Sequence, residues 1–298
     1  MTLGAMQNYS VYPAIFDALT VNHILSLGFD SNVQKLVAMA GGSLDPALIA
    51  EVSRENEIKI STGDIATFLA GVSHVNGELV TSTGEIQYQQ RADGGAYKNT
   101  SEHVTLNSTR GILLPRTISS SQDAQEVAAL EFSYIPFRVG TNAPFVVNVN
   151  QALTGVPAVI ASYKQGPIEY ENTLLKDVQD SSTDFGLTFE HFRGSGDIAA
   201  STGSITKREP KMEFGARNLE LANAIGGGLK GMTNGITQYY RNTLYADASN
   251  NHIAISLAAG TYEVTSISGS GDKSVDKKVT VTGTGQFSID LAAAIPSA

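Results

Sequence analysis

The sequence predicts a mainly β protein made of two tandem homologous domains, each a β-sandwich or barrel-like unit with one short helix. One stretch, Ser101–Phe132, occurs again at Asn250–Val281, and the two copies align without a gap. Short strand patterns are separated by turn residues about every ten residues, which is typical of all-β sandwiches and barrels. A helical pattern follows a strand at matching places in the two halves of the chain, and this indicates one helix in each copy.

The repeat extends over most of the chain in a constant order. His103 falls on His252 and Gly111 on Gly260. The other pairs in this stretch are Ile118 and Ile267, Ser119 and Ser268, Ser121 and Ser270, Asp123 and Asp272, Val104 and Ile253, Leu106 and Ile255, and Leu130 and Val279. Outside it, 53–60 resembles 207–214, 12–16 resembles 156–160, and Phe145, Val147 and Val149 match Phe287, Ile289 and Leu291. Because loop insertions leave collinear matches with varying shifts, we predict a first domain at residues 1–154 and a second at 155–298.

Length and composition agree with two domains and exclude several classes of protein. A chain of 298 residues has room for about two domains, each with its own core. It has no cysteine, so disulfides, thiolate metal sites and cysteine catalysis are excluded. We expect neither a secretory signal nor a membrane helix, because no basic segment with a following apolar run opens the chain and no apolar stretch approaches about 20 residues.

The charge of the chain bears on its partners. The formal net charge of −9 argues against wrapping nucleic acid, which requires clustered lysine and arginine. Charged residues make up only 16% of the chain, below the usual quarter or so, and small polar residues take their place. A surface poor in long charged side chains suits a protein that is largely covered by neighbouring subunits.

In the first domain the chain pattern predicts strands before and after one helix. No helix or strand is predicted for residues 8–27, because their apolar residues recur with neither a helical nor a strand period. Strands are expected at 33–39 and 47–52, flanking a turn at 41–46, and Ile58 and Ile60 should point inward from the next strand. A helix is expected at 65–71, capped by Thr62 or Asp64 and ended by Gly71. Its apolar face consists of Ile65, Phe68 and Leu69.

The remaining elements repeat between the halves. The second copy of the strand and helix is expected at 212–214 and at 218–225, closed by Gly226. Strands are then expected at 86–89 and 236–241, and the first of these precedes a loop at 91–95. The repeated stretch predicts a strand before the turn at Gly111 or Gly260, a strand up to a serine-rich turn, and a strand ending at Phe132 or Val281. A last strand, 145–149 or 287–291, completes each half.

No pattern in the sequence indicates catalysis. The five histidines, His23, His74, His103, His191 and His252, show no metal-ligand spacing. His103 and His252 are either a matched binding pair or residues at a shared structural position, and we favour the second interpretation. The glycine-rich run 226–233 lacks the order of a phosphate-binding loop, so we expect a flexible connector. We expect structural roles for Glu190, His191 and Asp197. We therefore predict a protein that is not an enzyme, with no catalytic, cofactor-binding or metal-binding residues and no cofactor.

The first copy resembles virion proteins of tailed bacteriophages, and most of all tail tube proteins. The residues that carry the resemblance are the strand, cap and short helix at 57–71, the strand and loop at 86–95, and the segment 111–116. It covers roughly residues 56–132, and the second copy follows it more loosely. These motifs are structural and not catalytic.

The resemblance implies a β-sandwich with a flanking helix whose strands pair across subunits into a ring. Tube proteins usually present six such domains per ring, so three copies of a duplicated chain would form a pseudo-hexamer. It implies a virion location in the tail after synthesis in the bacterial cytoplasm, and contacts with other virion proteins. DNA would pass through the lumen without specific binding, and an acidic lumen would repel its phosphates. The loops at 41–46 and 194–203 are candidates to bridge stacked rings.

Two other classes remain open. The first is a duplicated capsid, decoration or minor tail protein, in which twin β domains build a shell or bind one. The second is a carbohydrate-binding surface module, which would need aromatic side chains in a groove. The chain has no tryptophan and its eleven tyrosines are scattered, so the second class is disfavoured. The stretch 226–235 is expected to be more flexible than its counterpart in the first copy, which indicates that the two copies make different contacts.

Overall fold

The computed structural model describes residues 8–39, 46–72, 83–91, 96–98, 101–122, 127–155, 157–158, 160–175, 177–216, 229–268 and 276–297. Over these residues the chain is mainly β, as the sequence predicted, with a single α-helix, α1 (Ile65–Gly71). The strands of the first half are β1 (Asn8–Val11), β2 (Ala14–Phe16), β3 (Leu19–Val21), β4 (Ile24–Met39), β5 (Pro46–Thr62), β6 (Gly84–Arg91), β7 (His103–Ser108), β8 (Gly111–Ser121), β9 (Ala129–Pro136) and β10 (Val146–Gln151). Those of the second half are β11 (Tyr163–Tyr170), β12 (Thr173–Leu175), β13 (Val178–Asp184), β14 (Leu187–Phe192), β15 (Thr202–Arg208), β16 (Lys211–Ala216), β17 (Lys230–Gly231), β18 (Ile236–Asn242), β19 (His252–Leu257), β20 (Gly260–Ser268), β21 (Asp276–Gly283) and β22 (Ser288–Ala293).

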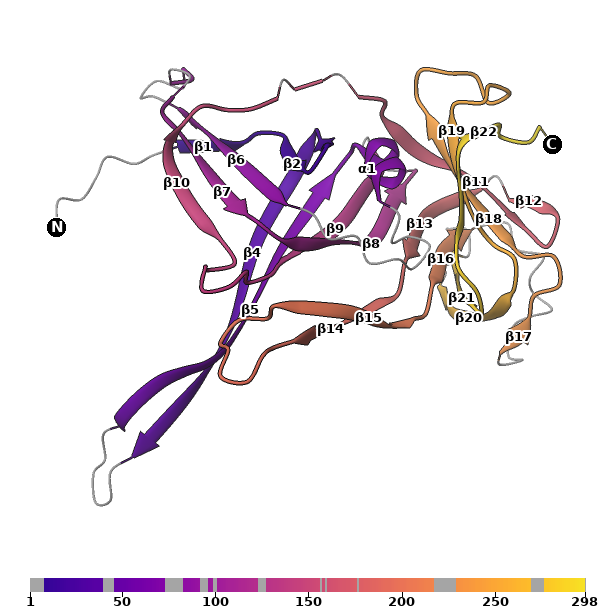
Figure 1. Cartoon of the computed structure of the whole chain (residues 1–298). Helices are drawn as coiled ribbons and strands as arrows, with labels where there is room; N and C mark the ends of the chain where they lie inside the picture. Colours follow the sequence, from indigo (N-terminus) through magenta and orange to yellow (C-terminus); the bar gives the residue numbers. More distant parts are fainter. Residues whose placement is uncertain are drawn as a thin grey trace.

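These strands form four antiparallel sheets (Figure 1). A six-stranded sheet has the order β10-β7-β6-β2-β3, with β1 also paired to β6, and a five-stranded sheet has the order β12-β11-β18-β19-β22. A nine-stranded sheet, β17-β20-β21-β16-β13-β8-β9-β5-β4, runs through both halves of the chain. The fourth sheet is the hairpin of β14 and β15.

The order of strands is the same in the two halves. The six-stranded sheet places β10, β7, β6 and β2 side by side, and the five-stranded sheet places β22, β19, β18 and β11 in the corresponding positions. Within the nine-stranded sheet, the run β8-β9-β5-β4 is matched by the run β20-β21-β16-β13. The two runs meet where β13 pairs with β8, so the far ends of the sheet are β4 and the strands β20 and β17.

Each smaller sheet packs its side chains against the nine-stranded sheet. In the first half the ring of Phe16 on β2 lies 5.9 Å from that of Phe132 and 5.0 Å from that of Tyr134, both on β9. In the second half Tyr240 on β18 is fully buried, and its hydroxyl lies 2.9 Å from the Thr183 hydroxyl on β13. The buried side chains form one continuous core that extends through both halves.

The short helix follows the sequence prediction except at its cap. Ile65, Phe68 and Leu69 are buried, as their spacing predicted, and the Phe68 ring lies 4.3 Å from that of Phe132. Asp64 occupies the N-cap position, but its side chain does not cap the helix. Its carboxylate instead accepts hydrogen bonds from the backbone N–H (3.1 Å) and the side-chain amide (3.3 Å) of Asn22. The prediction of a side-chain cap is therefore wrong for Asp64.

Several predicted features lie outside the described residues. They are the second helix at 218–225 with Gly226, most of the turn at 41–46, and most of the loop at 91–95. The strands around the first turn are longer than predicted: β4 begins at Ile24, well before residue 33, and β5 continues to Thr62, well beyond residue 52. Ile58 and Ile60 are buried, which confirms that they point inward.

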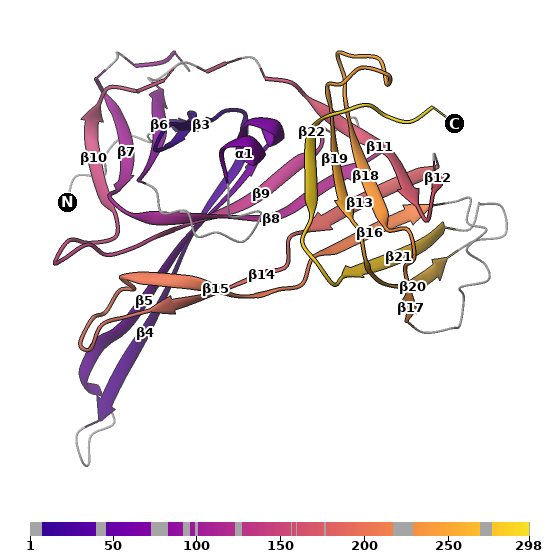
Figure 2. The same ribbon diagram turned by 45° about the vertical axis from the view of Figure 1, so that its right-hand side comes forward.

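Two hairpins project from the nine-stranded sheet (Figures 1 and 2). The outer part of β4 and β5 extends away from the rest of the molecule. It carries exposed apolar side chains, namely Leu36, Val37, Leu48, Ile49 and Val52. The hairpin β14–β15 belongs to the second half but reaches back beside β5, where the Arg54 N–H donates to the Ile198 carbonyl at 2.8 Å.

Replacing Phe132 with alanine tests the packing between the sheets. Phe132 is fully buried and contacts rings from both β2 and α1, so we expect the free energy of unfolding to fall by about 3–5 kcal/mol. Urea unfolding followed by circular dichroism measures the change. The control is Val147→Ala on exposed β10, which should alter stability by at most about 0.5 kcal/mol. Equal effects of the two substitutions would contradict this account of the core.

Candidate self-assembly interface

The two runs of the nine-stranded sheet join through one antiparallel pair of strands. On β13 and β8 the pairing extends from Asp180 opposite Ser121 to Asp184 opposite Thr117. Backbone hydrogen bonds continue on both sides of it. The N–H of Phe185 donates to the carbonyl of Arg116 (2.9 Å), and the N–H of Gln122 donates to that of Gln179 (2.7 Å). The junction is therefore a fully bonded strand pair and not a loose contact between two units.

A buried polar cluster lies beneath this junction. The side-chain oxygen of Gln165, on β11, accepts hydrogen bonds from the hydroxyls of Ser120 on β8 and Ser181 on β13, the latter at 2.7 Å. The two hydroxyls lie 3.0 Å apart, and all three side chains are buried. Because a shift of the strands would leave these groups unsatisfied in the interior, the cluster favours one register at the junction.

The ends of the same sheet carry strands that lack a neighbour on one side. At one end, β4 has no second strand partner among the described residues. At the other end, β17 covers only Thr261 and Tyr262 of β20, so in the described chain the following segment 264–268 is unpaired along its outer edge. An uncovered strand edge presents backbone N–H and C=O groups that can pair with another chain.

Interruptions of the regular strand pairing fall at matching places in the two runs of the nine-stranded sheet. The β4–β5 pairing is interrupted at 24–26, and the β13–β16 pairing is interrupted at 178–180, each time at the end of the paired segment. The β8–β9 pairing is interrupted at 115–117 and the β20–β21 pairing at 264–266. In strand order and in the place of these interruptions, the free edges match the two strands joined inside the chain: β4 matches β13, and β20 matches β8.

The two repeated histidines hold equivalent positions in the smaller sheets. His103 begins β7, and its Nδ1 accepts a hydrogen bond from the backbone N–H of Gln90 at 3.1 Å. His252 begins β19, and its Nδ1 accepts from the backbone N–H of Asn242 at 3.0 Å. Both rings are buried. Each histidine thus satisfies a buried backbone donor of the neighbouring strand, which agrees with the structural interpretation of the pair.

Arg116 connects the hairpin β14–β15 to the outer face of the first half. Its guanidinium donates to the hydroxyl of Ser133 (2.8 Å), to Glu57 Oε1 (3.0 Å) and to the carbonyl of Leu187 (2.9 Å). The Ser133 hydroxyl also donates to Glu57, at 2.5 Å. Partial burial raises the pKa of the Glu57 carboxyl, but the hydrogen bonds from Ser133 and Arg116 outweigh it and hold the pKa below its ordinary value.

The residues singled out near the tip of the second hairpin have structural surroundings. Asp197 forms an ion pair with Arg138, which follows β9 of the first half. The ring of His191 lies 5.1 Å from that of Phe189, and burial lowers the pKa of the histidine. The ion pair of Asp197 with Arg138 and the hydrogen bond from Arg116 to Leu187 hold the hairpin β14–β15 against the first half, and sequence reasoning did not find them because the partners are distant in the chain.

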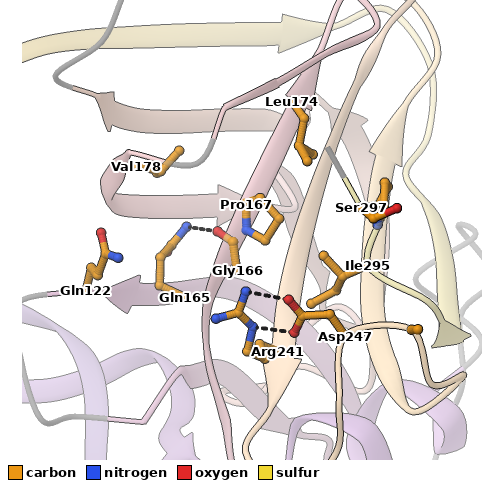
Figure 3. A pocket seen from close by; sticks show the side chains of 12 residues that line it. Gln122, Gln165, Gly166, Pro167, Leu174, Val178, Arg241, Asp247, Ile295 and Ser297 are labelled. Carbon is orange, nitrogen blue, oxygen red and sulfur yellow. Dashed lines mark hydrogen bonds and ion pairs between the residues drawn. The ribbon is translucent and has the colours of Figure 1, made fainter.

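The pocket shown in Figure 3 has a volume of about 460 Å³ and lies beside the ends of β11 and β18. Arg241 and Asp247 point toward each other at its edge, joined by hydrogen bonds of 2.8 and 2.9 Å. The Gln165 amide donates to the Gly166 carbonyl at 2.8 Å. The charges of the pocket therefore neutralise each other, and no lining side chain is placed as a nucleophile activated by a base. In the described ranges, no group of three or more histidine, aspartate or glutamate side chains could hold a metal ion.

Comparisons with known proteins give no family: no family model matches the chain, and no curated protein matches it. Within the portion of the chain described by the structure, no helix has both the length and the apolar character needed to cross a membrane.

Replacing each paired histidine tests its role. We expect His103→Ala and His252→Ala each to lower the free energy of unfolding by about 1–3 kcal/mol, because a buried N–H loses its acceptor. Asparagine places an oxygen near the position of Nδ1, so His103→Asn and His252→Asn should recover part of the loss. Urea unfolding at neutral pH measures all four variants. Equal destabilisation by alanine and asparagine would show that the loss of stability does not come from the lost hydrogen-bond acceptor.

The Glu57 cluster predicts a loss of stability in acid. The pKa of the Glu57 carboxyl in the folded protein lies below its ordinary value of 4.5. The ionised carboxylate therefore adds to the free energy of unfolding above pH 4.5, and this stabilisation is lost as the pH falls through the folded pKa. Glu57→Gln should lower the free energy of unfolding at pH 7 by about 1 kcal/mol, since the group is partly exposed, and should flatten its decline below pH 4.5.

Unfolding by urea between pH 3 and pH 7 measures this change. Glu263→Gln, on the exposed face of β20, is the matched control and should leave the curve nearly unchanged. An unaltered pH dependence in Glu57→Gln would contradict the role given to this carboxylate.

Proposed function

We propose that this chain is a structural subunit that assembles with copies of itself into closed rings, and that the rings stack into a hollow tube like the tail tube of a tailed bacteriophage. The observation that carries the proposal is the nine-stranded sheet. Its two runs are joined head to tail through β13 and β8, and its ends expose β4 and β20, the counterparts of the strands already joined.

The proposal includes an internal duplication of a β-sandwich domain, with domains at 1–154 and 155–298. The matching strand orders, the matching interruptions of pairing and the equivalent histidines support it. At the boundary, the side chain of Gln87 on β6 holds Thr154 through hydrogen bonds to its N–H (2.6 Å) and carbonyl (2.8 Å). The first domain is therefore fastened up to its last residue.

Head-to-tail contacts lead to a ring when the rotation from each chain to the next closes into a full circle, and to an open filament when it does not. A contact that repeats the internal junction would relate successive domains in the same way along the assembly. With two domains per chain, three chains would complete a ring of six domains, which is the pseudo-hexamer implied by the resemblance. Closure would also cover the exposed strand edges, which otherwise favour uncontrolled association.

The tube would serve as a conduit for DNA during ejection. The net charge of −9 supports a lumen that repels phosphate, so that DNA slides through without specific binding. The protein would then have no enzymatic activity and no cofactor, and would contact other virion proteins in the tail. The projecting hairpin β4–β5 and the turn at 194–203 are proposed to bridge stacked rings, and the predicted loop 41–46 between β4 and β5 lies mostly outside the described residues.

The runner-up is a duplicated capsid, decoration or minor tail protein. It would use the same strand edges but close into a shell or bind to one, so the edges support both functions equally. A carbohydrate-binding surface module has less support. The exposed aromatic side chains among the described residues lie on four separate segments of the chain, and no described pocket is lined by them; they are Phe29, Tyr97, Phe192 and Tyr245.

Negative-stain electron microscopy of the purified protein, paired with its mass in solution, tests the proposal. We expect hollow tubes of stacked rings, and a three-chain ring as the smallest closed species. Under conditions that dissociate the tubes, the chain should remain folded by circular dichroism. A protein that stays monomeric at high concentration, or that forms closed shells, would contradict the tube and favour a minor tail or capsid role.

A further inference from the structure

We infer that β4 of one copy pairs antiparallel with β20 of the next copy, in a register that places Asp30 opposite Ser266 and Phe29 opposite Ile267. The inference deepens the proposed function, and it rests on the self-assembly that function requires. The occupant of each free edge is a second copy of this chain. The internal junction of β13 and β8 supplies the template for the register.

The β4 side of the register follows from the interruptions of pairing. The matched interruptions begin at Ile24 in β4 and at Val178 in β13. Asp30 lies six residues after Ile24 and Asp184 lies six residues after Val178, so Asp184 corresponds to Asp30. Both residues hold the same place in the pairing with the adjacent inner strand: Asp30 faces Glu57, five residues before Thr62, and Asp184 faces Lys211, five residues before Ala216. The correspondence therefore holds along the whole segment that faces the junction.

The β20 side follows in the same way. Gly111 begins β8 and Gly260 begins β20, and the interruption comes at the same distance from each glycine. Thr117 thus corresponds to Ser266. In the internal junction Asp184 lies opposite Thr117, so its counterpart Asp30 falls opposite Ser266 of the neighbouring copy.

The backbone groups of both edges are suitably placed for this pairing. In the internal junction the Phe185 N–H donates to the Arg116 carbonyl. Because bonded pairs alternate along antiparallel strands, the pair Thr183 and Ile118, two residues further on, also exchanges hydrogen bonds. The counterparts of this pair are Phe29 and Ile267. The outward N–H and C=O groups of Phe29 would therefore bond to those of Ile267.

The side chains of the free edge favour burial more than those of the internal junction do. Leu25 and Phe29 are 47% and 50% exposed in the single chain. Their counterparts in the internal junction are Gln179 and Thr183, and Thr183 is buried there. When the second copy covers an apolar side chain at such a position, the contact between copies is stabilised by about 25 cal/mol for each Å² of apolar surface removed from water.

The charges along this row are also complementary. Ser266 lies opposite Lys278 on β21, so Asp30 of the neighbour would lie in the same row as an exposed lysine. In the internal junction the corresponding row has Lys211 and Asp184 on one side and Thr117 and Glu131 on the other, so the lysine lies beside the aspartate within one half.

Cysteine cross-linking tests the register directly, because the chain has no cysteine of its own. Asp30 and Ser266 would form a non-hydrogen-bonded pair, whose Cα atoms lie about 4.5 Å apart, within the range of a disulfide bond. The full chain carrying Asp30→Cys and Ser266→Cys should give cross-linked multimers on non-reducing gels after mild oxidation. Reduction should return them to single chains.

The matched control is the full chain carrying Gly28→Cys and Ser266→Cys. Gly28 has open space for a side chain, but it is displaced by two residues, or about 7 Å along the strand, so we expect about tenfold less product. Equal cross-linking by the control, or cross-linking by Asp30→Cys alone, would overturn the register. The second result would indicate that two β4 strands pair with each other.

Proline substitutions test the edges by a second route. Phe29→Pro and Ile267→Pro each remove one outward N–H from an edge that is unpaired in the single chain, so each variant should fold but not assemble. An equimolar mixture should form dimers and nothing larger, because each variant retains the edge that the other lacks. Unfolding curves check that the folds are intact. A proline variant that assembles as the parent does would overturn the inference.

The outcomes separate this inference from the proposed function. Cross-links at Asp30 and Ser266 in open filaments or shells would support the pairing of β4 with β20 while contradicting the tube. Tubes in which the Asp30→Cys and Ser266→Cys chain assembles without cross-linking would overturn the pairing while leaving the tube in place.

Discussion

The structure depends above all on the requirement that backbone N–H and C=O groups at a strand edge find partners. Inside the chain, β13 and β8 would each be an edge if the two halves were separated, and they satisfy each other by pairing. The nine-stranded sheet results from this one contact. The same requirement then applies to β4 and β20, whose outer edges have no strand partner beyond the short β17 in the described chain. These two edges are the ones that the proposed contact between copies would pair.

Buried polar side chains fix the register at the places where a slip would be most damaging. A shift of one residue in a β pairing turns each side chain to the opposite face, so a half-buried sheet needs its register specified. His103 and His252 specify it between strands of the smaller sheets, because each accepts one particular backbone N–H. Gln165 does so at the junction, where it accepts from a hydroxyl on each of the two joined strands. Apolar packing alone would tolerate displacements that these hydrogen bonds do not.

The sequence indicated much of the local structure and little of its assembly. Alternation at Ile58 and Ile60 and the spacing of Phe68 are local patterns, and the predicted strand and helix are confirmed. The gap-free alignment placed Leu130 on Val279, whereas the registers place Phe132 there, since Gly111 to Phe132 spans 21 residues and Gly260 to Val279 spans 19. The carboxylate of Asp64 binds Asn22 instead of capping the helix. The junction itself could not be predicted, because pattern and propensity do not say which strand edges meet.

The difference between the internal junction and the free edges has a physical reason. Strands joined within one chain meet at high effective concentration, so their contact can rest on backbone bonds and small polar side chains such as Ser120 and Ser181. Two separate chains lose translational and rotational freedom when they associate, and the contact between them must offset that cost with additional burial. Leu25 and Phe29 supply apolar surface at positions where β13 carries Gln179 and Thr183. Under the proposed duplication and assembly, the two versions of this edge differ in the direction that their connectivities require.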